Sequence, residues 1–215
     1  IWEFRSEEKH YTYSKFMCHT GVDRAIKIAQ HFGKDYLVNE WIDLRDEIKN
    51  DILKNAYNEE KKAFTMFYGG DELDASILHM TYHEFLEYND PRLINTVKQI
   101  YKHLRKDHLV QRYKTKDDFG TSKSAFTICS FWLIDALAHI GEIDKAKNIF
   151  NKIIKKSNHL GLFSEDIDVA TGNLTGNFPQ AYTHIALINT SVLLSEWSAK
   201  RKKIDWSEVK REKWF

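Results

Sequence analysis

Three separated stretches of this 215-residue sequence carry side chains that could act on a substrate. The first is Ile1-Trp2-Glu3-Phe4-Arg5, in which a carboxylate stands between two aromatic residues. Desolvation by such neighbours raises the pKa of a carboxyl group, so that it can donate a proton near neutral pH. The other interpretation is a glutamate at the start of a helix that pairs with Arg5.

The second stretch, residues 161–168, places Glu165, Asp166 and Asp168 in one predicted loop beside an apolar Leu-Phe pair. Three interpretations are open: a general base, a calcium loop, or carboxylates that stabilise turns. A calcium loop typically has more alternating Asp or Asn ligands and an accompanying glycine. Turn formation is the most frequent role of such aspartates.

The third stretch contains Arg112 and Tyr113, followed by Asp117 and Asp118. An arginine beside a tyrosine can bind sugar hydroxyls or orient a carboxylate, and a salt bridge within the loop is equally compatible with the pattern. Residues 68–74 predict a tight turn that leads to a helix cap at Asp74, which is a structural role.

Other candidate sites are weaker. His79 and His83 are four residues apart, but the HExxH pattern of metalloproteases is absent, so we expect an ordinary helix face. Cys18 and Cys129 have no metal-ligand spacing, and we expect two free thiols. The sequence predicts no metal site and no organic cofactor.

Composition excludes some partners. The net charge is +1, from 32 basic and 31 acidic residues, which argues against nucleic acid or an anionic membrane as the main partner. No apolar run approaches the roughly 20 residues of a membrane span. Hydrophobic residues make up 42% of the chain, enough to form a core.

Hydrophobic periodicity predicts an all-α fold, because apolar residues recur at helical spacing and Pro and Gly are scarce. Seven helices are expected, at residues 12–32, 37–55, 75–86, 90–104, 124–140, 143–157 and 180–197. The helix at 124–140 is apolar over most of its circumference, which is typical of a helix buried on all sides.

Buried-type and amphipathic helices alternate along the chain, which indicates stacked helical hairpins of about 50–60 residues. The helices that start near residues 12, 75, 124 and 180 are expected in an inner layer, with the others outside. Long polar loops precede the inner helices, so these loops should meet at one rim and form the site there.

Six segments together resemble glycoside hydrolase family 15, the family of glucoamylases, glucodextranases and trehalases, and most closely its prokaryotic branch. In chain order they are IWEFR, HYTYSKFMCHTGVDRAIKIA, YGGDELDASIL, DPRLINTV, RYKTKDDFGTSKSAFTICSFWLIDALA and NHLGLFSEDIDVATGNLTGNFPQAYTHIALIN. The resemblance implies an (α/α)6 toroid, of which this chain supplies about the last seven helices. Residues 1–199 would belong to the catalytic barrel and residues 200–215 to a C-terminal tail.

The resemblance also implies roles for individual residues. Glu3 matches the general acid and Glu165 the general base of an inverting glycosidase, which needs no metal or cofactor. Arg112 and Trp2 match residues that contact the sugar of the innermost subsite. Trp132 and Tyr182, on inner helices, are expected near the substrate.

The chain departs from the family pattern in two respects. Phe4-Arg5 stands where several relatives have a second acid, so the outer subsites are expected to differ. The family's early barrel helices, their Arg-Asp pair and the N-terminal β-sandwich are not in this sequence, which also lacks an initiator Met, so we expect a fragment that needs this N-terminal remainder as its partner.

The expected activity is release of β-glucose from the non-reducing ends of an α-glucan or malto-oligosaccharide. Trehalose is the alternative substrate. A non-catalytic carbohydrate-binding protein and a helical-repeat interaction protein are alternatives of another class. The sequence leaves the compartment open, with the cytoplasm preferred.

Overall fold

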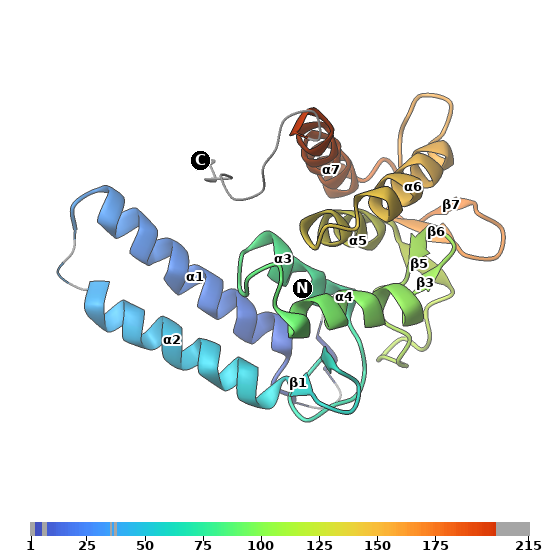
Figure 1. Ribbon diagram of the computed structural model, residues 1–215. Helices are drawn as coiled ribbons and strands as arrows, with labels where there is room; N and C mark the ends of the chain where they lie inside the picture. Colours follow the sequence, from blue (N-terminus) through green and yellow to red (C-terminus); the bar gives the residue numbers. More distant parts are fainter. Residues whose placement is uncertain (1–2, 6–7, 35, 37, 201–215) are drawn as a thin grey trace.

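The structure, a computed structural model, describes residues 3–5, 8–34, 36 and 38–200, and it is mostly helical (Figure 1). Within these residues there are seven α-helices and several short strands. The α-helices are α1 (Thr12–His31), α2 (Val38–Asn55), α3 (His79–Tyr82), α4 (Pro91–His103), α5 (Thr127–His139), α6 (Ile143–Ile153) and α7 (Ala181–Lys200). Of the predicted tail, residues 200–215, the first residue ends α7 and residues 201–215 lie outside the described residues.

The strands form three small sheets that shape the loops between helices. Two are antiparallel pairs and the third has the order β5-β6-β7. Their members are β1 (Tyr57–Asn58) with β2 (Ala63–Phe64), β3 (Arg105–Lys106) with β4 (Leu109–Val110), and β5 (Ser124–Phe126) with β6 (Asp166–Asp168) and β7 (Leu174–Thr175). In the third sheet Phe126 pairs with Asp166 and Ser124 with Asp168.

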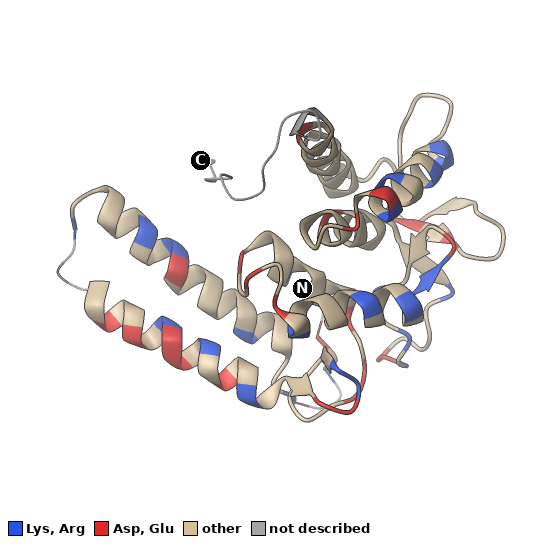
Figure 2. Ribbon diagram, in the orientation of Figure 1, with Lys and Arg blue, Asp and Glu red and all other residues tan. Residues whose placement is uncertain are grey.

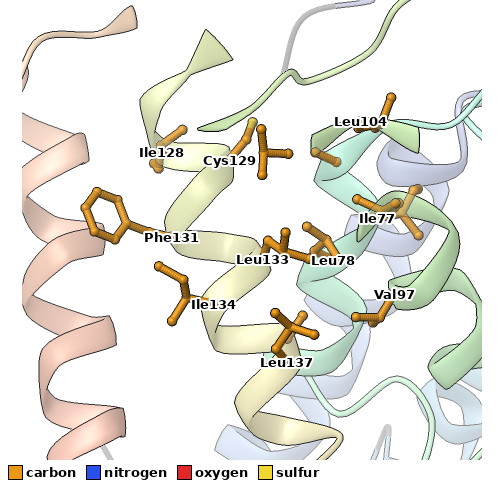
Figure 3. Packing of buried hydrophobic residues seen from close by; sticks show 14 of the residues in the cluster. Ile77, Leu78, Val97, Leu104, Ile128, Cys129, Phe131, Leu133, Ile134 and Leu137 are labelled. Carbon is orange, nitrogen blue, oxygen red and sulfur yellow. The ribbon is translucent and has the colours of Figure 1, made fainter. Parts of the chain in front are cut away.

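The centre of the core is α5, as its sequence predicts. Ten of its residues are buried, and it contacts α3, α4, α6 and α7. Figure 3 shows Leu133 beside Leu78 of the 3₁₀ helix η2 (Ala75–Leu78), with Leu137 on the same face of α5. Burial over most of its circumference explains why α5 contains a single acid, Asp135.

Three predicted elements differ from the observed ones. The expected helix at 124–140 begins only at Thr127, because residues 124–126 pair with β6 instead. The expected helix at 75–86 is the short succession of η2 and α3, and Glu84 with φ of 60° follows its end. The expected helix at 143–157 finishes as the 3₁₀ helix η3 (Ile154–Lys156).

Helix α7 presents an apolar surface that the described residues leave uncovered. Figure 2 shows few charged residues on it, in contrast to α2 and α6. Ile185 is 57% exposed, Ile188 60% and Val192 50%. In the part of the chain that the structure describes, no helix is both long and apolar enough to cross a bilayer.

Candidate active site

The loops that precede the predicted inner helices are joined to one another by backbone hydrogen bonds, as expected for a common rim. Tyr68 N donates to His10 O (3.0 Å), Ala75 N to Arg112 O (2.7 Å), and Thr127 N to Glu165 O (2.9 Å). Each bond connects a loop with another loop or with the start of a helix that is far away in sequence. The predicted inner elements also touch, since η2 contacts α1 and α5, and α5 contacts α7.

A cavity of about 660 Å³ opens among these elements. Its wall includes four residues that the sequence singled out, namely Arg112, Trp132, Glu165 and Tyr182. Most of the remaining wall is apolar or aromatic, as in sites that bind small molecules. The structure therefore brings these four side chains to one concave surface.

Glu165 is held at the edge of the cavity by the loop after β7. Its Oε2 accepts hydrogen bonds from Asn177 N (3.2 Å) and Asn177 Nδ2 (3.0 Å), and its own N donates to Asn177 O (2.8 Å). Gly176 packs against it with φ of 76°. A carboxylate that is half-buried and fixed by an amide is suited to orient a water molecule.

The loop before β6 owes its shape to local bonds. The Asn158 side chain accepts from Leu160 N (3.0 Å) and Leu162 N (2.9 Å), and Phe163 is buried with its ring centroid 5.9 Å from that of Phe131. Burial of Phe163 fixes the chain two residues before Glu165. This burial explains the Leu-Phe pair that precedes the acids in the sequence.

The two other acids of residues 161–168, Asp166 and Asp168, have separate roles. Asp168 Oδ1 accepts from Ala170 N (2.9 Å) and Thr171 N (2.7 Å), so for this residue the turn interpretation is confirmed. These bonds lower the pKa of Asp168. Asp166 accepts a hydrogen bond from the Ser124 hydroxyl, and burial raises the pKa of its carboxyl group.

The sequence left two roles open for Arg112, a place in a binding site and a salt bridge, and the structure shows features of both. It lines the cavity, and it also forms an ion pair with the buried Asp74, with Nη2 3.2 Å from Oδ2. Its guanidinium carbon lies 5.1 Å from the ring centroid of Tyr113. Tyr113 in turn donates a hydrogen bond to Asp117 (2.8 Å).

Glu3 lies in a segment that is attached to the start of α1 and to the loop after Arg112. Ser14 Oγ donates a hydrogen bond to Glu3 Oε1, Phe4 N donates to Tyr11 Oη (2.9 Å), and Arg5 N donates to Asp118 Oδ2 (2.7 Å). Among the described residues the Glu3 side chain is exposed and is not part of the cavity wall, so its desolvation and its role as acid stay predictions. Trp2 lies outside the described residues.

Further polar residues of the cavity wall were not assigned to the site from the sequence, among them His79, which was considered only as a metal ligand, Asp135 and Asn189. Both ring nitrogens of His79 are buried without a hydrogen-bond partner among the described residues, and burial lowers its pKa to about 4, so it is neutral at pH 7. His79 is thus not the ordinary helix-face residue expected. Its ring contacts Trp132 edge to face, with centroids 4.4 Å apart.

Asp135 is the single acid of α5, and its Oδ1 is buried without a hydrogen-bond partner among the described residues. Burial raises its pKa from 3.8 to about 7, and the Thr190 side chain offsets part of this rise. A carboxyl group within an otherwise apolar helix was the signal in the sequence that could have identified it.

A cavity that combines a carboxylate, an arginine and aromatic side chains is suited to bind a polar ligand with apolar faces, such as a sugar. The family comparison identifies the class of protein: the model of glycosyl hydrolases family 15 matches residues 1–192. The chain belongs to glycosyl hydrolase family 15.

Curated relatives of high similarity are trehalases. The trehalase of Mycobacterium tuberculosis (strain H37Rv) is 43% identical over 195 residues, covering 89% of this chain and 28% of that protein. The trehalase of Thermoplasma acidophilum is 38% identical over 202 residues, covering 94% of this chain and 35% of that protein. The chain therefore spans about a third of the length of these relatives.

Solved structures show the same fold at low sequence identity. A structure described as a wild-type glycosidase superposes with a TM-score of 0.76 at 14% identity, covering 90% of this chain and 55% of that chain. The mostly helical architecture is thus the one found in glycosidases. The described residues do not by themselves show the closed toroid that the resemblance implies.

Proposed function

We propose that this chain contributes to an α,α-trehalase that cleaves its substrate with inversion. The observation that carries the proposal is the set of trehalase relatives, 43% and 38% identical over most of this chain. These relatives favour trehalose over the α-glucan that was first expected.

In the proposed mechanism Glu165 is the general base and Glu3 the general acid. Glu3 protonates the glycosidic oxygen, and Glu165 removes a proton from a water molecule that attacks the anomeric carbon from the opposite face. Such a pair needs carboxyl groups about 6.5–9.5 Å apart. The contacts of Glu165 with Asn177, and of Glu3 with Ser14, support fixed positions for both groups.

The cavity wall supplies the proposed sugar contacts. Arg112 offers guanidinium donors to hydroxyl groups, and Trp132 and Tyr182 offer aromatic surfaces to the apolar face of a pyranose ring. Trp2 is proposed to add an aromatic wall to the innermost subsite. The neutral imidazole of His79 adds a polar group to the same wall.

We further propose that other helices of the same protein complete a closed barrel. The uncovered apolar side chains of α7 support this, because exposed hydrophobic surface of this kind typically marks an interface. The share of each trehalase that this chain covers, 28% and 35%, agrees with it. The proposed partner of this exposed surface is the N-terminal remainder of the same protein, which would contain the early barrel helices and a β-sandwich.

The substrate is tested with the complete gene product that contains this chain, incubated separately with trehalose and maltotriose while released glucose is measured. We expect trehalose to be cleaved with the higher kcat/KM. Cleavage of maltotriose with no action on trehalose would instead establish a glucoamylase-type enzyme. Inactivity on both would favour a non-catalytic binding or interaction protein.

The roles of the two carboxylates are tested by Glu165→Gln and Glu3→Gln. Each substitution keeps the size of the side chain and removes its acid–base chemistry, so kcat should fall by about 10²-fold or more. Glu142→Gln is the matched control, since Glu142 forms a surface ion pair with Lys145 away from the cavity. If either variant has the same kcat as the Glu142→Gln control, the role assigned to that glutamate is wrong.

A further inference from the structure

The carboxylate of Asp74 makes two sets of contacts beside Arg112, which lines the cavity. Its Oδ1 accepts a hydrogen bond from Ser76 N (2.8 Å) and thereby caps η2. Its two oxygens also face the guanidinium of Arg112, with Nη2 3.2 Å from Oδ2 and Nε 3.4 Å from Oδ1. One carboxylate therefore links the start of a helix to a side chain of the site.

Burial makes this ion pair a directional contact rather than a loose surface attraction. Asp74 is 3% exposed and the Arg112 side chain 12%. A buried carboxylate that lost its cationic partner would be strongly destabilised, so the pair is expected to persist. A carboxylate that contacts Nε and Nη2 together also restricts the rotation of the planar guanidinium.

The backbone connects the same two loops. Ala75 N, adjacent to Asp74, donates to Arg112 O at 2.7 Å, so both the main chain and the side chain of Arg112 are attached to the start of η2. Arg112 thus reaches the cavity from a loop whose position depends on residues 74–75. A flexible loop arginine would not be held in one orientation without such support.

From these contacts we infer that Asp74 is a positioning residue, which orients the guanidinium of Arg112 toward the sugar in the cavity. Asp74 is absent from the cavity wall itself, so it acts through Arg112 and not by contact with substrate. The inference rests on the proposed function, because the sugar contact of Arg112 belongs to that proposal.

The informative substitution is Asp74→Asn. Asparagine is as good a helix cap as aspartate, so the bond to Ser76 N is retained. The substitution removes the negative charge and places an amide, which is a donor, where the guanidinium needs an acceptor. We expect kcat/KM for trehalose to fall by about 10- to 100-fold, the effect of losing charge-assisted hydrogen bonds that orient a substrate contact.

Asp90→Asn is the matched control. Asp90 also caps a helix, α4, through Arg92 N (2.8 Å) and also pairs with an arginine, Arg92 (2.7 Å), but both residues lie outside the cavity wall. Its substitution should leave kcat/KM within about twofold of wild type. An equal loss in both variants would show that removal of any such ion pair is harmful, and would overturn the inference.

A double-mutant cycle separates positioning from general stabilisation. In an Arg112→Met background Asp74→Asn should change kcat/KM by less than about twofold, because the group that Asp74 orients is gone. A loss in that background as large as in wild type would mean that Asp74 acts independently of Arg112. If Asp74→Asn alone does not fold, recovery of folding in the double variant supports the pairing, and failure of both variants overturns the inference.

A structural readout distinguishes this inference from the proposed function. If wild type does not cleave trehalose, the proposed function fails, and the crystal structure of Asp74→Asn then decides the positioning role. The inference predicts an Arg112 guanidinium displaced from its wild-type orientation above an unchanged η2. A guanidinium that keeps its wild-type orientation would contradict it.

Discussion

Replacement of Asp135 by asparagine should change how the stability of the protein depends on pH. In the folded chain burial raises the pKa of this carboxyl group from 3.8 to about 7. The folded state therefore keeps a proton that the unfolded state releases. The stability that this proton gives is fully present below about pH 4 and is lost as the pH rises to about 7.

The size of the effect follows from the two pKa values. Each pH unit between them corresponds to about 1.36 kcal/mol, so the largest possible loss is about 4 kcal/mol between pH 4 and pH 7. Between about pH 5 and pH 7 the expected loss is about 2 kcal/mol, because the folded carboxyl group is itself half ionised at pH 7. Asparagine does not titrate, so Asp135→Asn should lack this dependence and gain stability relative to wild type as the pH rises.

Urea unfolding of both proteins, followed by tryptophan fluorescence at about pH 5 and pH 7.5, measures the difference. The control is Asp43→Asn, which removes a carboxylate from the exposed face of α2. Its free energy of unfolding should remain within about 0.5 kcal/mol of wild type at both pH values. If the difference between wild type and Asp135→Asn is the same at both pH values, Asp135 does not carry the proton and the reasoning is refuted.

Three further substitutions test the local environments of Glu165, helix α1 and the core. Gly176→Ala would place a Cβ atom 3.0 Å from Glu165 Oε2, at a φ of 76° that alanine adopts poorly, so stability should fall by about 1 kcal/mol and kcat by about tenfold or more; a fully active variant would show that Glu165 tolerates displacement. Gly21→Ala meets no atom within 4 Å in helix α1 and should raise the free energy of unfolding by about 0.5–1 kcal/mol in urea titrations. Leu133→Ala removes a fully buried side chain of α5 and should lower it by about 2–5 kcal/mol; a loss below about 1 kcal/mol would contradict the packing described.

Helix positions were predictable where local chemistry determines them. Asp90 caps α4 with Pro91 in its first turn, and Asp74 caps η2, as the sequence indicated. The prediction was wrong where tertiary pairing outweighs helix propensity. Residues 124–126 read as the start of an apolar helix, but β6 offers them a partner strand that lies some forty residues further along the chain.

The candidate site was predictable in part for a similar reason. Arg112 and Glu165 lie in polar loops that precede inner helices, where the sequence predicts a site. Both line the cavity. Asp135 and His79 lie on elements whose pattern indicates core, and only the structure shows that their faces open into the same cavity. Aromatic neighbours in the sequence made burial one of two interpretations of Glu3, and its side chain is exposed in the described chain.

The stereochemistry of trehalose cleavage by the complete gene product is the most direct test of the central claim. Proton NMR of the first products, recorded before mutarotation mixes them, distinguishes the two anomers of glucose. Attack by a water molecule activated by Glu165 inverts one anomeric carbon and leaves the other unchanged, so α-glucose and β-glucose should appear in equal amounts. Release of α-glucose alone would show retention and would contradict the proposed roles of Glu3 and Glu165.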